Sequence, residues 1–131
     1  MPDNNRGCAC GNAPTLIFPC SGAADVGEIS DRAARELTRD GVGKMFCLAG
    51  LGGHVESFLT NTQAAGKILV IDGCPVDCAK KTLEHAGFSG FLHFKVTDLD
   101  CVKGNSPAID ETINRIAAHG KNMLSKEECC S

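Results

Sequence analysis

Cysteine gives this chain most of its chemical reactivity, because nine cysteines occur among 131 residues. Two of them, Cys74 and Cys78, lie four positions apart in the stretch IDGCPVDCAKK, residues 71–81. Thiolates at such a spacing can bind zinc or act as a redox pair, and free cysteines are also common in protein cores. The other seven are Cys8, Cys10, Cys20, Cys47, Cys101, Cys129 and Cys130. The pattern alone leaves a metal site, a redox site and core packing open.

The length and the cysteine count bound the class of protein. A chain of 131 residues fits one domain and can bury a core without disulfides. Small disulfide scaffolds are rich in loops, whereas apolar runs and helical patterns alternate here, and the odd cysteine count leaves one thiol unpaired. The N-terminus shows no secretory signal, and no stretch approaches the roughly 20 apolar residues of a membrane helix. We therefore expect a single domain in the reducing cytoplasm, with no membrane partner.

The charge of the chain gives no support for a nucleic-acid partner. The net charge is −3 at pH 7, and the lysines and arginines are scattered along the sequence. Tryptophan and tyrosine are absent, which removes most of the side chains that stack on bases. We expect no nucleic-acid binding, and the sequence identifies no protein partner.

Four short apolar runs predict strands, and each is followed by a helical pattern, the second of them short, around residues 55–63. The predicted strands cover residues 15–19, 44–48, 67–72 and 91–96. This βαβαβαβα order is typical of a single-domain, three-layer α/β fold with a four-stranded, mainly parallel sheet, of the Rossmann or flavodoxin-like type. The predicted domain covers residues 15–120, between a flexible N-terminal segment, 1–14, and a C-terminal tail, 121–131.

Glycine, proline and serine predict where the helices begin and end. Gly41 is expected to end the first helix, and Gly87 the third. Pro75 is expected in the first turn of the third helix. The pair Ser106-Pro107 is expected to form the N-cap and first residue of the last helix.

Three cysteines fall where predicted strands end. Cys20 follows the first strand, Cys47 lies at the end of the second and Cys74 follows the third. The carboxyl ends of parallel strands share one edge of a sheet, where open α/β folds bind ligands. If the three strands are contiguous, at about 4.8 Å spacing, their thiols lie within roughly 10 Å of one another. We expect Cys74 to be the N-cap of the next helix and Cys78 its fourth residue, so that both side chains lie on one face.

Four thiolates around one ion form the tetrahedral arrangement of structural zinc sites. The predicted zinc ligands are Cys20, Cys47, Cys74 and Cys78. A helix N-terminus near Cys74 would favour the thiolate form, which assists metal binding and nucleophilic chemistry alike.

The motifs CSGAADVG (20–27), KMFCLAGLGG (44–53) and IDGCPVDCAKKTLEHAG (71–87) together give the chain a family resemblance. They resemble the DGC domain family, which is named for a central Asp-Gly-Cys, here residues 72–74. The resemblance implies a zinc-binding protein with four potential chelating cysteines, which match the four predicted ligands. It implies no reaction and no wider biochemical role.

The loop CSGAADVG also has the character of an anion cradle, because its small residues expose backbone N–H groups before a helix. Low-molecular-weight phosphatases begin such a loop with a cysteine, and an arginine six residues further on clamps the oxyanion. Here that position is Val26, and the first arginine after it is Arg32, well into the helix. A small anionic ligand at the Cys20 loop is therefore a candidate partner, and phosphatase chemistry is not expected.

Three residues near the predicted site have two interpretations each. His54 is a fifth ligand candidate or, as we expect, a surface histidine. Cys101, after the fourth strand, is the main rival for a ligand place. Asp72 either orients a ligand or caps a neighbouring loop through backbone N–H groups. The other histidines give no signal of function, and the cysteines of the two chain ends are expected to be flexible thiols outside the site.

The cysteine pattern supports two functions. The first is a zinc-binding protein, which is a metal-stabilised binding module if the site is closed and an enzyme or sensor if a ligand displaces one thiolate. The second is cysteine-based redox, thiol-transfer or persulfide-transfer chemistry without a structural metal. Cys20 or Cys74 would then be the attacking thiolate, and Cys78 or Cys47 would resolve the intermediate. The sequence does not decide whether the protein is an enzyme.

Overall fold

Four parallel strands form one sheet in the computed structural model, which describes residues 13–126. Their order in the sheet is β2 (Lys44–Met45), β1 (Thr15–Pro19), β3 (Lys67–Asp72) and β4 (Leu92–Lys95). β1 pairs with β3 along its full length, from Thr15 opposite Lys67 to Pro19 opposite Ile71. The predicted α/β class and parallel sheet are therefore confirmed.

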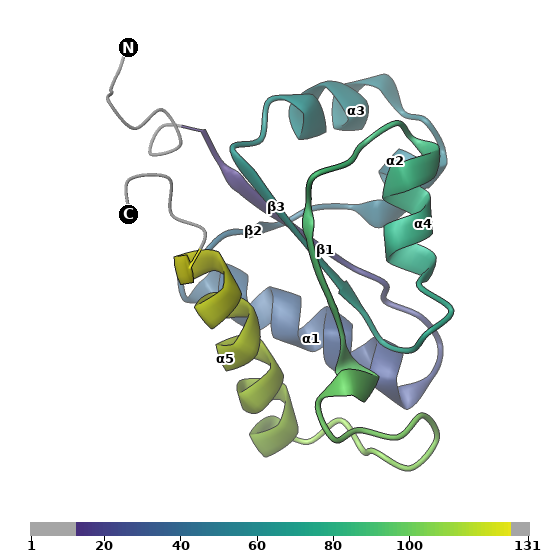
Figure 1. Ribbon diagram of the computed structural model, residues 1–131, viewed down its shortest axis with the longest axis vertical. Helices are drawn as coiled ribbons and strands as arrows, with labels where there is room; N and C mark the ends of the chain where they lie inside the picture. Colours follow the sequence, from purple (N-terminus) through teal and green to yellow (C-terminus); the bar gives the residue numbers. More distant parts are fainter. Residues whose placement is uncertain (1–12, 127–131) are drawn as a thin grey trace.

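Helices cover both faces of this sheet (Figure 1). One face packs against α1 (Asp25–Arg39) and α5 (Asp110–Lys126), and the other against α2 (Leu48–Gly52), α3 (Glu56–Gln63) and α4 (Cys78–His85). Alternate residues of a strand point to opposite faces, so Ile17 joins the core beneath α1 and α5, whereas Leu16 and Phe18 join the core beneath α2 and α4. Both faces are buried, which gives the predicted three layers.

β1 lies inside the sheet, so the first two crossovers move across the sheet in opposite directions. The first crossover leads from β1 to β2 at the sheet edge, and the next returns past β1 to β3 on its other side. Open α/β sheets bind ligands at the carboxyl ends of the strands where the order reverses, which here lie between β1 and β3. The three strands that lead to Cys47, Cys20 and Cys74 are contiguous, as the predicted cysteine site requires.

The second strand is much shorter than predicted. Its ladder extends through Phe46, whose N–H donates to the carbonyl of Ile17 at 2.8 Å, but the chain then turns into α2 with Cys47 at the N-cap. The glycine-rich sequence after Cys47 carries no helical pattern, so α2 was not predicted. α3 agrees with the helix expected around residues 55–63.

The predicted helix ends are confirmed, and two predicted helix starts are wrong. Gly41 and Gly87 have φ values of 76° and 96°, the left-handed conformation that commonly follows a helix. α4 begins three residues after Pro75, and α5 begins three residues after Pro107. Ser106 does not cap α5, because its hydroxyl accepts the N–H of Val102 at 2.7 Å.

α5 continues beyond the predicted domain boundary at residue 120. The helix reaches Lys126, the last described residue, and Leu124 is buried in the same core as α1. The apolar spacing of Ile116, Gly120 and Leu124 explains the extension, because each faces the sheet side of the helix. Of the predicted flexible ends, 1–14 and 121–131, only residues 13–14 and 121–126 are described.

None of the helices in residues 13–126 has the length and apolar content needed to cross a membrane.

Candidate functional site

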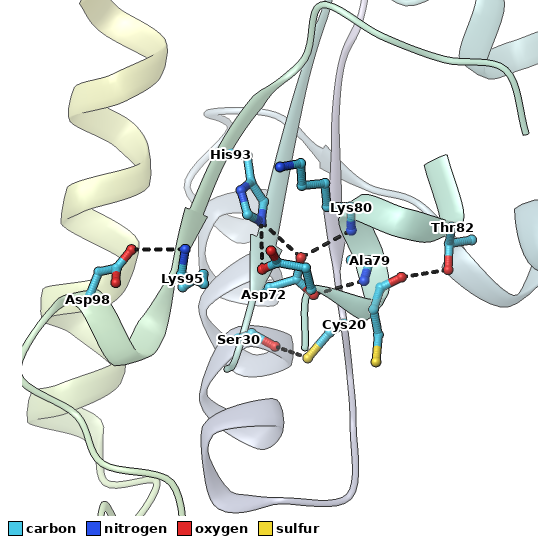
Figure 2. A network of polar contacts seen from close by, with 11 residues as sticks. Cys20, Ser30, Asp72, Ala79, Lys80, Thr82, His93, Lys95 and Asp98 are labelled. Atoms are coloured by element: carbon cyan, nitrogen blue, oxygen red, sulfur yellow. Dashed lines mark hydrogen bonds and ion pairs between the residues drawn. The ribbon is translucent and has the colours of Figure 1, made fainter. Parts of the chain in front are cut away.

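Cys20 follows β1 and is tied to both β3 and α1. Its backbone N–H donates to the carbonyl of Ile71 at 2.9 Å, which continues the pairing of the two strands by one step. Its sulfur lies 3.3 Å from the hydroxyl of Ser30, and that hydroxyl donates to the carbonyl of Gly27 (Figure 2). The thiol is half-buried and held at the start of the loop that leads into α1.

Cys74 lies two residues beyond the end of β3, the strand that pairs with β1. It is half-buried and packs against the core beneath α1 and α5. Its sulfur lies 3.6 Å from the ammonium of Lys103, which donates to it. This contact places a cationic side chain beside the sulfur.

Gly73 permits the close contact between the end of β3 and the start of α1. A Cβ atom at this position would lie 2.8 Å from the backbone carbon of Val26 and 2.9 Å from the backbone nitrogen of Gly27. The carbonyl of Gly73 also accepts the N–H of Thr97 at 3.2 Å. The glycine of the Asp-Gly-Cys motif is therefore required by packing, and it places Cys74 beside the Cys20 loop.

Gly73→Ala is expected to lower the free energy of unfolding by about 2 kcal/mol, because the new methyl group meets backbone rather than a movable side chain. Gly52→Ala is the matched control, since the nearest atom to its Cβ is the Thr82 methyl at 3.9 Å. Urea unfolding of both variants measures the difference. Equal stability of the two variants would contradict the packing role of Gly73.

Cys78 is the first residue of α4, not the fourth as predicted. Asp77 takes the N-cap position in a left-handed conformation, with φ of 60°. The carboxylate of Asp72 caps this helix from the end of β3, because it accepts the N–H of Ala79 at 2.8 Å and of Lys80 at 3.0 Å. The helix can begin only where its first N–H groups reach this acceptor, which explains why Pro75 and Cys74 lie before it. The capping interpretation of Asp72 is confirmed.

His93 completes the contacts of the Asp72 carboxylate, although its sequence context carries no signal of function. Its Nε2 lies 2.9 Å from Oδ2 of Asp72 and 3.6 Å from Oδ1 of Asp77 (Figure 2). Among the described residues this is the one group of three potential ligands with all atoms within 4.8 Å. Each oxygen of Asp72 already accepts a backbone N–H, so the group first serves to fix the start of α4.

The register of β3 and β4 is the signal that could have identified His93. His93 lies opposite Val70, and Lys95 opposite Asp72, so His93 and Asp72 share one face of the sheet. The strands are visible in the sequence, but their pairing is not.

Cys47 and Cys20 line a common surface cavity of about 520 Å³. Cys47 is exposed at the N-cap of α2, and the cavity extends to Thr82 of α4. The hydroxyl of Thr82 donates to the carbonyl of Cys78 at 2.7 Å. The structure therefore places Cys20 and Cys47 on the lining of one cavity and Cys78 on a helix that borders it.

The four predicted ligands lie around one edge of the sheet without meeting at a point. Among the residues that the structure describes, no three of these sulfurs come within 4.8 Å of one another. All four are free thiols; Cys47 and Cys78 are exposed, and Cys20 and Cys74 are half-buried. They are accessible to an ion, and they come from three contiguous strand ends and the helix after the third.

Cys101 and His54, the other two ligand candidates, differ in burial. Cys101 is 5% exposed in the core beneath α1 and α5, where Arg115 donates to its sulfur at 3.6 Å. His54 is exposed, and its ring packs edge-on against that of His85, with 5.6 Å between centroids. The surface interpretation of His54 is confirmed. Cys8, Cys10, Cys129 and Cys130 lie outside the described residues.

The first turn of α1 contains a carboxylate, that of Asp25, which accepts backbone hydrogen bonds. The carboxylate of Asp25 accepts the backbone N–H groups of Gly104, Ser106 and Val26 at 2.7 to 2.9 Å. The hydrogen bond from Gly104 and then that from Ser106 hold the pKa of Asp25 below its ordinary value. These contacts anchor the loop after η2 (Val96–Asp98) beside the start of α1.

Comparisons with known proteins agree with the motifs at this edge. The DGC domain description matches residues 16–119, which include all four cysteines. A curated relative, the "Anaerobic and virulence modulator AnvM" of Pseudomonas aeruginosa, is 31% identical over 83 residues, or 63% of each chain. The match therefore spans less than two thirds of that relative's length. No solved structure matches the chain. The extent of the family match, from β1 into α5, shows that this chain belongs to the DGC domain family.

Proposed function

We propose that this protein binds one zinc ion through the thiolates of four cysteines at the carboxyl edge of the sheet. The proposed ligands are Cys20, Cys47, Cys74 and Cys78. The observation that carries the proposal is the strand order β2-β1-β3, because it puts three cysteine-bearing strand ends side by side. Cys78 follows Cys74 at the start of the next helix.

The donor set fits zinc in its chemistry. Four free thiols without a disulfide partner are the ligand set of a closed tetrahedral zinc site. Closing them on one ion requires the loops after the three strands to draw together, since three sulfurs do not yet share a centre. The exposure of Cys47 and Cys78 leaves these two side chains room to move toward the half-buried pair.

Bound zinc would supply structural stability by joining the ends of three strands. Its binding energy then counts as folding energy, because the ligands meet only in the folded chain. The protein would serve as a metal-stabilised module of the cytoplasm, where a reducing environment keeps thiols available. If a ligand displaces one thiolate, the same site would act as a sensor. The relative from Pseudomonas aeruginosa carries the name of a modulator, which is compatible with a sensing role.

The purified protein is expected to contain one zinc ion per chain, and a chelator should make four more thiols reactive toward a thiol reagent, apart from the buried Cys101. Elemental analysis and thiol titration of the same sample measure both quantities. A metal-free protein, in which all exposed thiols react at once, would refute the zinc site.

A second candidate function is thiol–disulfide exchange, and the contact between Lys103 and the Cys74 sulfur favours it. The Cys74 thiolate would attack a disulfide substrate, form a mixed disulfide and release one substrate thiolate. The Cys78 thiolate would then attack the Cys74 sulfur and release the second substrate thiolate. The substrate disulfide is reduced, and Cys74 and Cys78 are oxidised to a disulfide.

The two functions give different results in the same titration. Exchange chemistry predicts no bound metal and one thiol that reacts much faster than the rest. Mass spectrometry of the labelled protein identifies that thiol, which should be Cys74. A zinc-containing protein in which Cys74 stays unlabelled until a chelator is added would exclude exchange as the main function.

A further inference from the structure

We propose that the cavity shared by Cys20 and Cys47 binds a small organic oxyanion, with the guanidinium of Arg35 holding the anionic group. The ligand class is a short apolar molecule with a terminal carboxylate or phosphate. This binding site requires the cavity and Arg35 but not the metal ion, so it goes beyond the zinc-binding function.

Arg35 reaches this cavity because α1 runs back along the sheet to β2. The hydroxyl of Thr38 accepts the N–H of Met45 at 2.8 Å, which attaches the end of α1 to the end of β2. Arg35 lies one turn earlier on the same side of the helix and lines the cavity with Cys20 and Cys47. Arg35 is too far along the chain to belong to a phosphatase-type loop, but the path of α1 brings it to the cavity that Cys20 and Cys47 line.

The hydrogen bonds of Arg35 orient it and leave most of its donors available. Its Nε donates to Oδ2 of Asp31 at 2.7 Å, and Oδ1 of Asp31 accepts the hydroxyl of Ser21 at 2.7 Å. Within residues 13–126, no group accepts a hydrogen bond from the two terminal nitrogens of Arg35. Those nitrogens form the fork that binds carboxylate or phosphate in a bidentate manner.

This network also holds the cavity in shape. The Asp31 side chain is 22% exposed, and both of its oxygens are used within the network. Ser21 has a φ of 51°, an unfavourable conformation for serine that its bond to Asp31 helps to maintain. The Asp31 carboxylate therefore links the Cys20 loop to Arg35.

Apolar side chains in the lining indicate the nature of the rest of the ligand. Met45, Phe46 and Leu48 line the cavity with apolar surface. A volume of about 520 Å³ lies in the range of small-molecule sites. A second cavity of about 530 Å³ adjoins at Cys47 and adds Arg39 to its lining.

Asp31 also lines the first cavity, but its two oxygens already accept hydrogen bonds from Ser21 and Arg35. The charged donors left over in the lining are the terminal nitrogens of Arg35, so the cavity favours an amphiphilic anion over a cation.

Hexanoate and hexyl phosphate are suitable probes, with hexanol and hexylamine as neutral and cationic controls of similar length. Amide NMR shifts of the protein, followed during titration, should move at Cys20, Phe46 and Cys47 for both anions. Hexanol should bind about tenfold more weakly, and hexylamine should not bind, because each lacks the charge that Arg35 requires. Comparing the two anions shows whether a carboxylate or a phosphate is preferred.

Arg35→Gln is expected to weaken hexanoate binding about tenfold. Arg32→Gln is the matched control: it removes the same charge from the same helix, but Arg32 contacts Ala108 and Asp110 and does not line the cavity. It should change the affinity by less than about twofold. Arg35→Lys keeps the positive charge but lacks the two terminal nitrogens of the guanidinium. Its affinity for hexanoate should lie between those of Arg35→Gln and Arg32→Gln.

Two results would overturn the proposal. One is equal affinity of the Arg35→Gln and Arg32→Gln proteins for hexanoate. The other is equal binding of hexanol and hexanoate to the unmodified protein, which needs no variant and so remains informative if Arg35→Gln fails to fold. Zinc content measured on the same samples separates this site from the metal site, since Arg35→Gln should retain the ion.

Discussion

Asp72→Ala is expected to lower the free energy of unfolding by about 3 kcal/mol. The Asp72 side chain is 1% exposed, and its carboxylate accepts the N–H groups of Ala79 and Lys80 and contacts the imidazole of His93. Removing it leaves two donors of the first turn of α4 without an acceptor in a buried place, and each costs about 1 to 3 kcal/mol. Urea unfolding measures the loss.

Asp98→Ala is the charge-matched control for this experiment. Asp98 forms an ion pair with Lys95 at 3.6 Å, but its side chain is 59% exposed, so its loss should cost less than about 0.5 kcal/mol. Asp72→Asn retains one acceptor oxygen, so its free energy of unfolding should lie between those of Asp72→Ala and Asp98→Ala. If Asp72→Ala were no less stable than Asp98→Ala, the capping of α4 by Asp72 would be disproved.

Cys74→Ser is expected to release zinc and to lower the melting temperature by about 10 °C relative to the zinc-loaded protein. The proposed ion joins three strand ends, so losing one ligand removes its contribution to folding. A chelator should lower the melting temperature of the unmodified protein by a similar amount and should leave that of Cys74→Ser unchanged. Thermal unfolding with and without chelator, together with elemental analysis, tests this prediction.

Cys101→Ser and Cys129→Ser are controls that distinguish the effect of losing the metal from other effects of replacing a cysteine. Cys101 is buried in the core, so its replacement by serine should lower the melting temperature while the zinc content stays at one per chain. Cys129→Ser should change neither quantity. Unaltered zinc content in Cys74→Ser would remove Cys74 from the ligand set.

Local sequence was sufficient for the two central strands and for the helix ends. β1 and β3 begin and end at the predicted residues because both faces of these strands are apolar and buried. Gly41 and Gly87 end α1 and α4 because the left-handed conformation at a helix end is a property of one residue.

Helix starts depended on acceptors far away in sequence, which local patterns do not reveal. α4 begins at Cys78 because the acceptor for its first N–H groups is Asp72, on the preceding strand. The expected start of α5 fails for a similar reason, since the N–H of Ser106 donates to Asp25 at 2.9 Å. In both places a good local cap signal is outweighed by a tertiary hydrogen bond.

The position of the candidate site was predictable, and its lining was not. Parallel strands followed by cysteines place Cys20 and Cys74 at one edge whatever the details of the loops. Arg35 and His93 reach the same edge only through the return of α1 to β2 and the register of β4 against β3. Neither the crossing of α1 nor the register is encoded in the spacing of residues along the chain.

During synthesis, β1, β2, β3 and the start of α4 leave the ribosome before β4 and α5. All four thiols are then present while the α1 face of the sheet still lacks its second helix, whose Ile116 packs with Ile29 and Leu69 in the finished core. An ion bound at that stage would cross-link the nascent strands from their edge. Under the zinc proposal, this cross-link would hold the three strand ends together until α5 packs on the sheet.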